Sequence, residues 1–352
     1  MKTGKLSESV LKRSVLGKIK KRRAEVIKGA GIGEDCAFLT LEKSRRPEEE
    51  AASVDIAVSM ETVVLPVKNA AYLAVMAAVN NLAAGGGVPV AVVLSVTLPT
   101  ETEEGQLKGL IGEAERCCRD LNIQIVGGHT EVSPWVKVPV VTASVTGKAA
   151  EAKKALEAFR RQQSYCKKKG NQKLDIVMSK WIGLEGTFIL AEEKEKELLK
   201  RYPAGLVNSA KELERWLSVG AEAEVALKRG VYAMHDIRNG GVFGALWELS
   251  LKVGLGFCVD LKKIPVKQET IEVCEFFGIN PYELLSGGAL LMLTEDGDGL
   301  VRALADGGIP SAVIGQADTG NDKIVRNGEE VRYLGPSPQD EIFKVMPEKA
   351  AL

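Results

Sequence analysis

The hydrophobic pattern of this chain alternates between strand-like runs and segments with helical spacing. Four apolar runs of strand length lie in the first half: 52–58, 88–98, 123–126 and 136–146. Between the first two, apolar residues at helical spacing predict a helix over 71–84, with Asn69 as its cap. Thr100 and Glu103 form a capping-box pattern and predict a second helix that reaches about Leu121.

The second half shows the same alternation after a change of composition. Residues 151–173 are rich in Lys, Arg, Glu, Ala and Gln, which indicates a charged linker. We therefore predict an N-terminal domain over 1–150, this linker over 151–173, and a C-terminal domain over 174–345. Strand 175–179, helix 242–253 and a hairpin turn at Asn327-Gly328 are expected in the second domain. The fold class predicted is α+β, that is, mixed α/β.

The charge balance argues against nucleic acid or a membrane surface as partner. The chain of 352 residues has 47 basic and 47 acidic residues, so no long-range field attracts a polyanion. The longest apolar stretch is interrupted by asparagines, glycines and a proline, which argues against a membrane span. Its six cysteines show no Cys-x-x-Cys spacing. We expect a cytoplasmic protein with reduced thiols.

Each of the two histidines lies in a polar cluster beside paired glycines. The first cluster follows the run 123–126 and comprises Gly127, Gly128, His129, Thr130 and Glu131. Paired glycines let a ligand approach the backbone. His129 can bind a phosphate oxygen, ligate a metal or satisfy a nearby carbonyl, and the sequence leaves these interpretations open.

The second cluster contains His235 and Asp236, followed by Gly240 and Gly241 before a predicted helix. Backbone N–H groups at a helix start suit a phosphate, and an aspartate can hold the accompanying metal. Asp236 is therefore the stronger of the candidates. Arg238 either adds charge to the phosphates or points into water.

Oxygen donors elsewhere in the chain fit the same ligand. The turn at Gly33 carries Asp35, and Glu61 follows a strand-like run; both can supply oxygen ligands to Mg²⁺. A solvated acidic turn and an exposed strand end are the alternatives. Asn80 and Asn81 stand in tandem near the end of an apolar helix, where a buried amide needs partners. Two such residues favour a site over a simple cap.

The order of these motifs resembles the AIR (aminoimidazole ribonucleotide) synthase-like superfamily. Gly33–Ala37 is similar to its Gly-Asp-Asp-Ala-Ala segment, and Val79–Ala83 to its Val-Asn-Asp-Leu-Ala helix. Gly127–Thr130 resembles its Gly-Gly-Asp-Thr turn, and His235–Leu249 its second-domain loop and helix. The similarity runs from about residue 4 to residue 316. It is strongest to a HypE-like, AIR synthase-related branch of hydrogenase maturation factors.

The resemblance implies a two-domain homodimer whose N-terminal domains pair through their sheets into a barrel. It implies ATP with Mg²⁺ in the cleft between domains and subunits, and a small-molecule substrate activated by an ATP phosphate. Carried onto this chain, Asp35, Glu61 and Asp236 hold Mg²⁺, Asn81 and His129 complete the phosphate side, and Asp236 and His129 are the catalytic candidates.

The chain also departs from the family pattern. Carboxylates that the family carries are replaced by Asn81 and His129, which weakens an oxygen site for Mg²⁺. HypE's C-terminal cysteine has no counterpart after Cys274. Two hypotheses follow: an ATP-dependent enzyme of ligase or phosphotransferase type, or a non-catalytic maturation factor of the same fold that acts through a metalloenzyme assembly protein.

Overall fold

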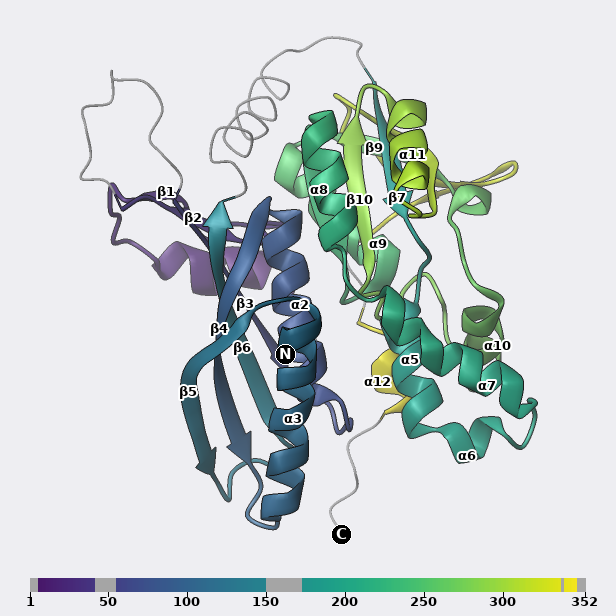
Figure 1. The fold of residues 1–352 in the computed structure, drawn as a ribbon. Helices are drawn as coiled ribbons and strands as arrows, with labels where there is room; N and C mark the ends of the chain where they lie inside the picture. Colours follow the sequence, from purple (N-terminus) through teal and green to yellow (C-terminus); the bar gives the residue numbers. More distant parts are fainter. Residues whose placement is uncertain (1–5, 42–54, 150–172, 337–338, 347–352) are drawn as a thin grey trace. The chain divides into compact units, whose positions relative to one another are not determined.

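The protein forms two compact units, shown in a computed structural model that describes residues 6–41, 55–149, 173–336 and 339–346 (Figure 1). The N-terminal unit comprises Arg23–Gly29 and the chain from Asp35 to residue 149. Residues 6–22, Ala30–Glu34 and the chain from residue 173 onward form the C-terminal unit. The expected linker over 151–173 lies almost wholly outside the described residues, so the domain boundaries stay a prediction.

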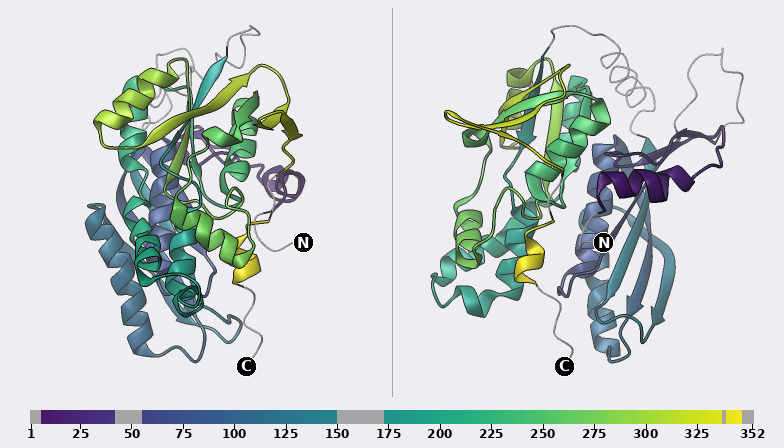
Figure 2. Two further views of the ribbon diagram at one scale, coloured as in Figure 1. Left: turned by 90° about the vertical axis from the view of Figure 1, so that its right-hand side faces the viewer. Right: turned by 180° about the vertical axis from the view of Figure 1, so that it is seen from behind.

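A six-stranded mixed sheet is the base of the N-terminal unit, with strand order β1-β2-β3-β6-β4-β5. Strands β4 and β5 are parallel, whereas the other neighbours are antiparallel. Two helices cover one face of this sheet (Figure 2). The elements are β1 (Val26–Lys28), β2 (Ala37–Leu39), β3 (Ile56–Val63), α2 (Ala70–Ala84), β4 (Gly87–Leu98), α3 (Glu104–Asp120), β5 (Gln124–Val132) and β6 (Val140–Ala149).

The two predicted helices of this unit are present, but their caps differ from expectation. Asn69 precedes α2 without a side-chain capping bond. The capping box of α3 is formed by Glu103 and Gln106, because Thr100 donates its hydroxyl to Glu101 instead. The N-cap of α3 is therefore Glu103, three residues after the predicted cap Thr100.

A seven-stranded sheet forms the centre of the C-terminal unit, with strand order β13-β12-β9-β11-β7-β10-β8. Its strands are β7 (Leu174–Ser179), β8 (Ala233–Ile237), β9 (Gly256–Asp260), β10 (Ala289–Thr294), β11 (Ser311–Asp318), β12 (Lys323–Asn327) and β13 (Glu330–Tyr333). Its longer helices are α5 (Leu184–Glu193), α7 (Ala204–Lys211), α8 (Gly220–Arg229), α9 (Gly241–Val253), α10 (Gln268–Phe277) and α11 (Gly297–Asp306). Its short helical segments are α1 (Glu8–Val10), η1 (Leu11–Val15), η2 (Leu16–Lys18), α6 (Glu195–Leu198), η3 (Glu212–Trp216), η4 (Leu261–Lys263) and α12 (Ile342–Val345).

Helices cover both faces of this second sheet. Ile176 of β7 belongs to the same buried cluster as Leu246 and Leu249 of α9. Asp175, the neighbour of Ile176 along β7, instead accepts a hydrogen bond from Gly297 N–H at the start of α11. Successive strand residues point to opposite faces, so α9 and α11 lie on opposite sides of the sheet. The mixed α/β architecture and the hairpin at Asn327-Gly328 are confirmed.

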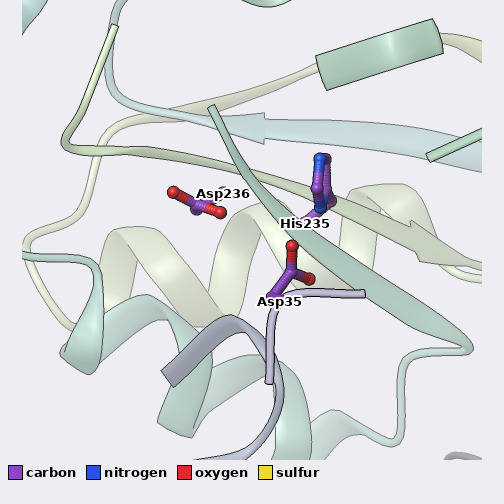
Figure 3. Close-up of side chains that lie close together, drawn as sticks. All are labelled: Asp35, His235 and Asp236. Carbon is purple, nitrogen blue, oxygen red and sulfur yellow. The ribbon is translucent and has the colours of Figure 1, made fainter. Parts of the chain in front are cut away.

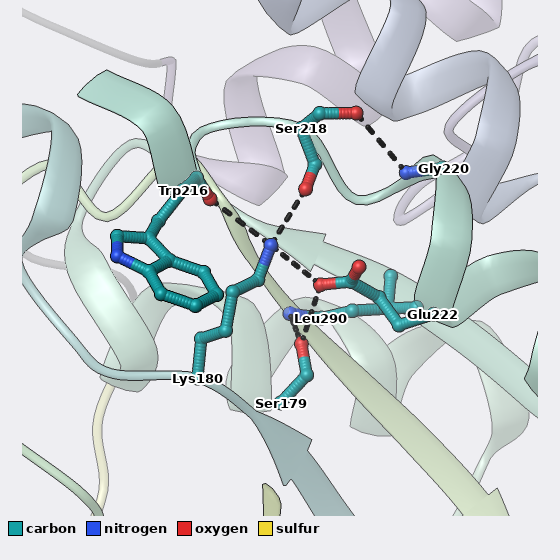
Figure 4. Close-up of polar contacts among 7 residues, drawn as sticks. All are labelled: Ser179, Lys180, Trp216, Ser218, Gly220, Glu222 and Leu290. Atoms are coloured by element: carbon teal, nitrogen blue, oxygen red, sulfur yellow. Dashed lines mark hydrogen bonds and ion pairs between the residues drawn. The ribbon is translucent and has the colours of Figure 1, made fainter. Parts of the chain in front are cut away.

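A buried ion pair joins Lys180, the residue after β7, to α8 (Figure 4). Lys180 Nζ lies 2.7 Å from Glu222 Oε1, and both side chains are at most 3% exposed. The same ammonium donates to the carbonyls of Trp216 and Ser218, at 3.0 and 2.6 Å. Ser179 completes the network by donating to Glu222 and accepting from Leu290 N–H, both at 3.0 Å. Every donor of the ammonium therefore has an acceptor.

No helix among the described residues is long and apolar enough to cross a membrane. Cys117 and Cys118 of α3 are both buried in the core of the N-terminal unit. Burial raises the pKa of Cys118 to about 11.

Candidate functional site

Two potential metal ligands are neighbours on strand β8. The strand is buried throughout, and His235 and Asp236 are only 5% and 7% exposed. One ligand atom of His235 lies within 4.8 Å of one ligand atom of Asp236 (Figure 3). Asp35 belongs to the N-terminal unit, so its part in a metal site stays a prediction. Asp236 is a predicted ligand, whereas His235 is not.

Helix α9 contacts His235 through the side chain of Glu248. Glu248 Oε2 lies 3.1 Å from His235 Nε2, and Glu248 is 15% exposed at its side chain. Lys252, one turn later, donates to the carbonyl of Met234. Gly33 has φ +70°, and a Cβ there would lie 2.6 Å from the carbonyl of Glu248, so only glycine fits this approach to the helix.

The start of α9 is already occupied by a carboxylate of the protein itself. We expected the N–H groups of Gly240 and Gly241 to face a phosphate. Instead, Gly240 donates to Asp340 Oδ2 at 2.7 Å, and Gly241 donates to the carbonyl of Arg238 at 3.1 Å. Gly241 is required for packing, because a Cβ there would lie 2.3 Å from the carbonyl of Tyr282. These two donors therefore serve the fold.

Arg238 neither points into water nor faces a phosphate from the surface, the two alternatives offered by the sequence. Its guanidinium is buried and contacts both carboxylate oxygens of Glu185, at 3.2 and 3.1 Å. Such a two-point contact fixes the orientation of the guanidinium and also neutralises its charge. The pair anchors the loop after β8 to the start of α5, and so fixes the position of Asp236.

In the N-terminal unit, the structure pairs two of the predicted site residues. Asn81 Nδ2 donates to Glu61 Oε1 at 2.8 Å. Asn80, the other member of the tandem, is 2% exposed. The amide of Asn81 therefore holds the carboxylate of Glu61 by a hydrogen bond.

The cluster around His129 is part of a strand and not the turn that the resemblance implies. Gly127, Gly128, His129, Thr130 and Glu131 all belong to β5, the edge strand, and all are exposed. His129 Nε2 lies 3.3 Å from Glu131 Oε2. A Cβ on Gly128 would lie 2.1 Å from the carbonyl of Leu94, whereas a Cβ on Gly127 would meet nothing within 4 Å. The close pairing of β5 with β4 therefore explains why residue 128 is a glycine, and no bound ligand is needed to explain it.

The residues at β8 fit a divalent cation. Carboxylates and imidazole are common ligands of metal ions in proteins, and the side chains of His235 and Asp236 are both buried, where an unshared charge is costly. Sequence reasoning missed His235 as a ligand. The signal that could have found it is its position beside Asp236 in a buried run, with Glu248 following on the next helix.

Comparison with known proteins identifies the family. Residues 33–149 match the N-terminal domain of AIR synthase related proteins, and residues 175–327 match the C-terminal domain of the same family. A putative hydrogenase expression/formation protein of Methanocaldococcus jannaschii is 25% identical over 64% of this chain and 62% of its own length. Carbamoyl dehydratase HypE of Rhizobium leguminosarum bv. viciae is 24% identical over 68% of this chain and 65% of its own length. The chain thus spans just under two thirds of these relatives.

Solved structures agree on the fold. A chain of a HypE–HypF complex superposes with a TM-score of 0.68 at 16% identity, covering 93% of this chain and 99% of that one. HypE in complex with ATP superposes with a TM-score of 0.65 at 18% identity, covering 87% and 90%. Both domain matches occur in family order and together cover well over half of the sequence. The chain belongs to the AIR synthase related protein family, and it has the two-domain fold of that family.

Proposed function

We propose that this protein is an ATP-dependent, HypE-like enzyme that activates a small-molecule substrate by phosphoryl transfer, with a divalent cation as cofactor. The observation that carries the proposal is the match of both domains to this family, together with the neighbouring buried ligands His235 and Asp236 on β8. The ATP complex of HypE, which shares the fold, supports the choice of nucleotide. Phosphoryl transfer needs mainly positioning and charge neutralisation, and buried carboxylates that hold a cation supply both.

In this proposal the residues divide into two groups. Asp35 and Asp236 hold the cation, and a bound cation neutralises charge on the phosphates. Gly33 packs closely on the carbonyl of Glu248 in α9, while the Glu185–Arg238 pair fixes the loop that follows Asp236. The residues proposed to line the nucleotide from the N-terminal unit are Glu61, Asn80, Asn81, Gly127, Gly128, His129, Thr130 and Glu131.

We further propose that a second copy of the chain covers the sheet face opposite α2 and α3. Among the described residues, Met60 of β3 and Val93 of β4 are 63% and 47% exposed on that face. Exposed apolar side chains on one sheet face indicate an interface. Light scattering after size exclusion tests this point: we expect a dimer for the wild type and a monomer for Met60→Asp/Val93→Asp, whereas a monomeric wild type contradicts the proposal.

The enzymatic proposal is tested by Asp236→Asn, which keeps the size of the side chain and removes its charge. We expect nucleotide turnover to fall at least about 100-fold, as for loss of one electrostatic contact in the transition state. Asp306→Asn, at an exposed position, is the matched control. Unchanged turnover in Asp236→Asn would contradict the assignment.

A second function is favoured by one observation, the amide of Asn81 in place of a carboxylate. In this alternative the protein is a partner-dependent or non-catalytic factor for assembly of a metalloenzyme. The names of the Methanocaldococcus relative and of the HypE–HypF complex support it. The double variant Asn81→Asp/His129→Asp distinguishes the two: a gain in ATPase activity favours a weakened enzyme, and no activity before or after favours the assembly factor.

A further inference from the structure

We infer that the N-terminal segment 6–22 is a docking surface for an acidic, amphipathic segment of a partner protein. The segment belongs to the C-terminal unit and is drawn in Figure 1 as purple helical turns. Docking of this kind goes beyond the proposed function, because it requires neither nucleotide binding nor turnover. Three features of the segment indicate it: exposed apolar side chains, a one-sided charge and a broken helical structure.

The segment leaves apolar side chains open to solvent. It forms three short helical stretches, α1, η1 and η2, and none of their residues is buried. Leu6 and Val15 are each 40% exposed, and Ile19 is 42% exposed. A helical segment that only packs on its own domain buries its apolar side. Single exposed apolar residues are ordinary, but three of them in one short basic segment indicate contact with another molecule.

The charge of the segment is one-sided. Six of its residues are basic and one is acidic, whereas the whole chain has 47 residues of each sign. Glu8, the acidic residue, pairs with Lys12. The remaining basic side chains are all exposed: Arg13, Lys18, Lys20, Lys21 and Arg22. The segment is therefore positive at short range in a balanced chain, and negative charge on a partner would speed encounter and fix the register of docking.

The broken helical structure argues against a lipid surface as the occupant. A helix that lies on an anionic membrane presents one continuous apolar face and carries Trp or Phe on it. The longest stretch here is the five-residue π-helix η1, and the 3₁₀ turn η2 follows it directly. The segment contains no aromatic residue. The same lack argues against single-stranded nucleic acid, because its bases stack on aromatic side chains.

An acidic protein segment fits all of these features. Its carboxylates would pair with the basic side chains, and its apolar residues would cover Leu6, Val15 and Ile19. Exposed ion pairs each contribute little, so burial of apolar surface has to supply the rest of the affinity. Binding should therefore depend on both kinds of residue, and this joint dependence distinguishes docking from simple attraction between charges.

The experiment measures binding of a fluorescein-labelled synthetic peptide of Glu and Leu residues to the full chain, by fluorescence anisotropy and without nucleotide. We expect saturable binding that Lys20→Glu/Lys21→Glu weakens at least about fivefold, because two attractions become repulsions. The matched control is Lys196→Glu/Lys200→Glu, which makes the same change of charge at exposed positions elsewhere. It should keep the affinity within about twofold of the wild type.

The apolar contribution is tested by Val15→Ser/Ile19→Ser, which leaves the charge unchanged and should also weaken peptide binding at least about fivefold. Circular dichroism checks that each variant keeps its fold. Four results would each overturn the inference: no peptide binding, an equal loss in the charge control, undiminished binding in Val15→Ser/Ile19→Ser, or binding to phosphatidylglycerol–phosphatidylcholine vesicles without binding of the peptide. Because nucleotide is absent throughout, such a failure is distinguishable from failure of the proposed function.

Discussion

Asp340 and Gly240, separated by 100 positions in the sequence, are joined by a 2.7 Å hydrogen bond from the backbone N–H to the carboxylate. The other oxygen of Asp340 accepts from Leu285 and Ile342 N–H, at 3.1 and 3.0 Å. A single carboxylate thus ties the chain before α12 to the start of α9, the helix that carries Glu248. The C-terminal segment around Asp340 therefore helps to fix the helix whose Glu248 contacts His235 on β8.

This carboxylate makes stability depend on pH. Burial raises the pKa of Asp340 from its ordinary 3.8 to about 6, with a smaller contribution from the charge of Glu185. The folded state therefore holds this proton more tightly than the unfolded state. The free energy of unfolding should fall as pH rises from about 4 to about 6, by about 3 kcal/mol from this group, and then level off.

Asp340→Asn removes this titration, so the pH slope of the variant should be flatter than that of the wild type over the same range. Urea unfolding at successive pH values, followed by tryptophan fluorescence, measures the difference. Asp306→Asn, which is exposed, should keep the slope of the wild type. Parallel curves for wild type and Asp340→Asn would contradict the argument.

Two adjacent glycines in β5 should respond differently to the same substitution. Gly128→Ala places a methyl group 2.1 Å from the carbonyl of Leu94, so β4 and β5 must separate. We expect a loss of about 1–3 kcal/mol in the free energy of unfolding, typical of overpacking. Gly127→Ala meets no atom within 4 Å and should change it by less than about 0.5 kcal/mol. Thermal unfolding of the two variants decides the point, and equal losses would show that close strand pairing is not the reason for Gly128.

Replacing one partner of the buried Lys180–Glu222 pair should lower the free energy of unfolding more than replacing both partners together. Burial lowers the pKa of Lys180 despite the attraction of Glu222. Glu222→Leu leaves an ammonium buried without a counter-charge, at a cost of about 3–5 kcal/mol. Lys180→Met/Glu222→Leu removes both charges and should recover much of that loss. A double-mutant cycle by chemical denaturation measures the coupling, and additive losses would contradict the role of the ion pair.

Much of the fold could be predicted, because the hydrophobic period carries most of the information. Helix α2 and strand β4 follow directly from their apolar patterns. The cap of α3 was misplaced, because Thr-x-x-Glu fits the capping pattern as well as the Glu103–Gln106 pair that forms it. The glycines at 127 and 128 resemble a turn of the family, but a glycine also serves where strands approach closely.

The candidate site was predictable to the extent that its chemistry lies in the residue types. Asp35 and Asp236 are expected as ligands from their residue types and motifs, and this assignment stays a prediction. The role of His235 depends on Glu248, which lies on the next helix and becomes its partner through tertiary packing. The carboxylate at the start of α9 could not be foreseen either, since Asp340 lies 100 positions away.

The most direct measurement of the central claim is calorimetric titration of ATP into the full chain, with Mg²⁺ and with EDTA. The account predicts binding near one nucleotide per subunit with Mg²⁺, and loss of that binding in EDTA. Absence of ATP binding under both conditions would contradict the account and indicate that the protein acts through its partners.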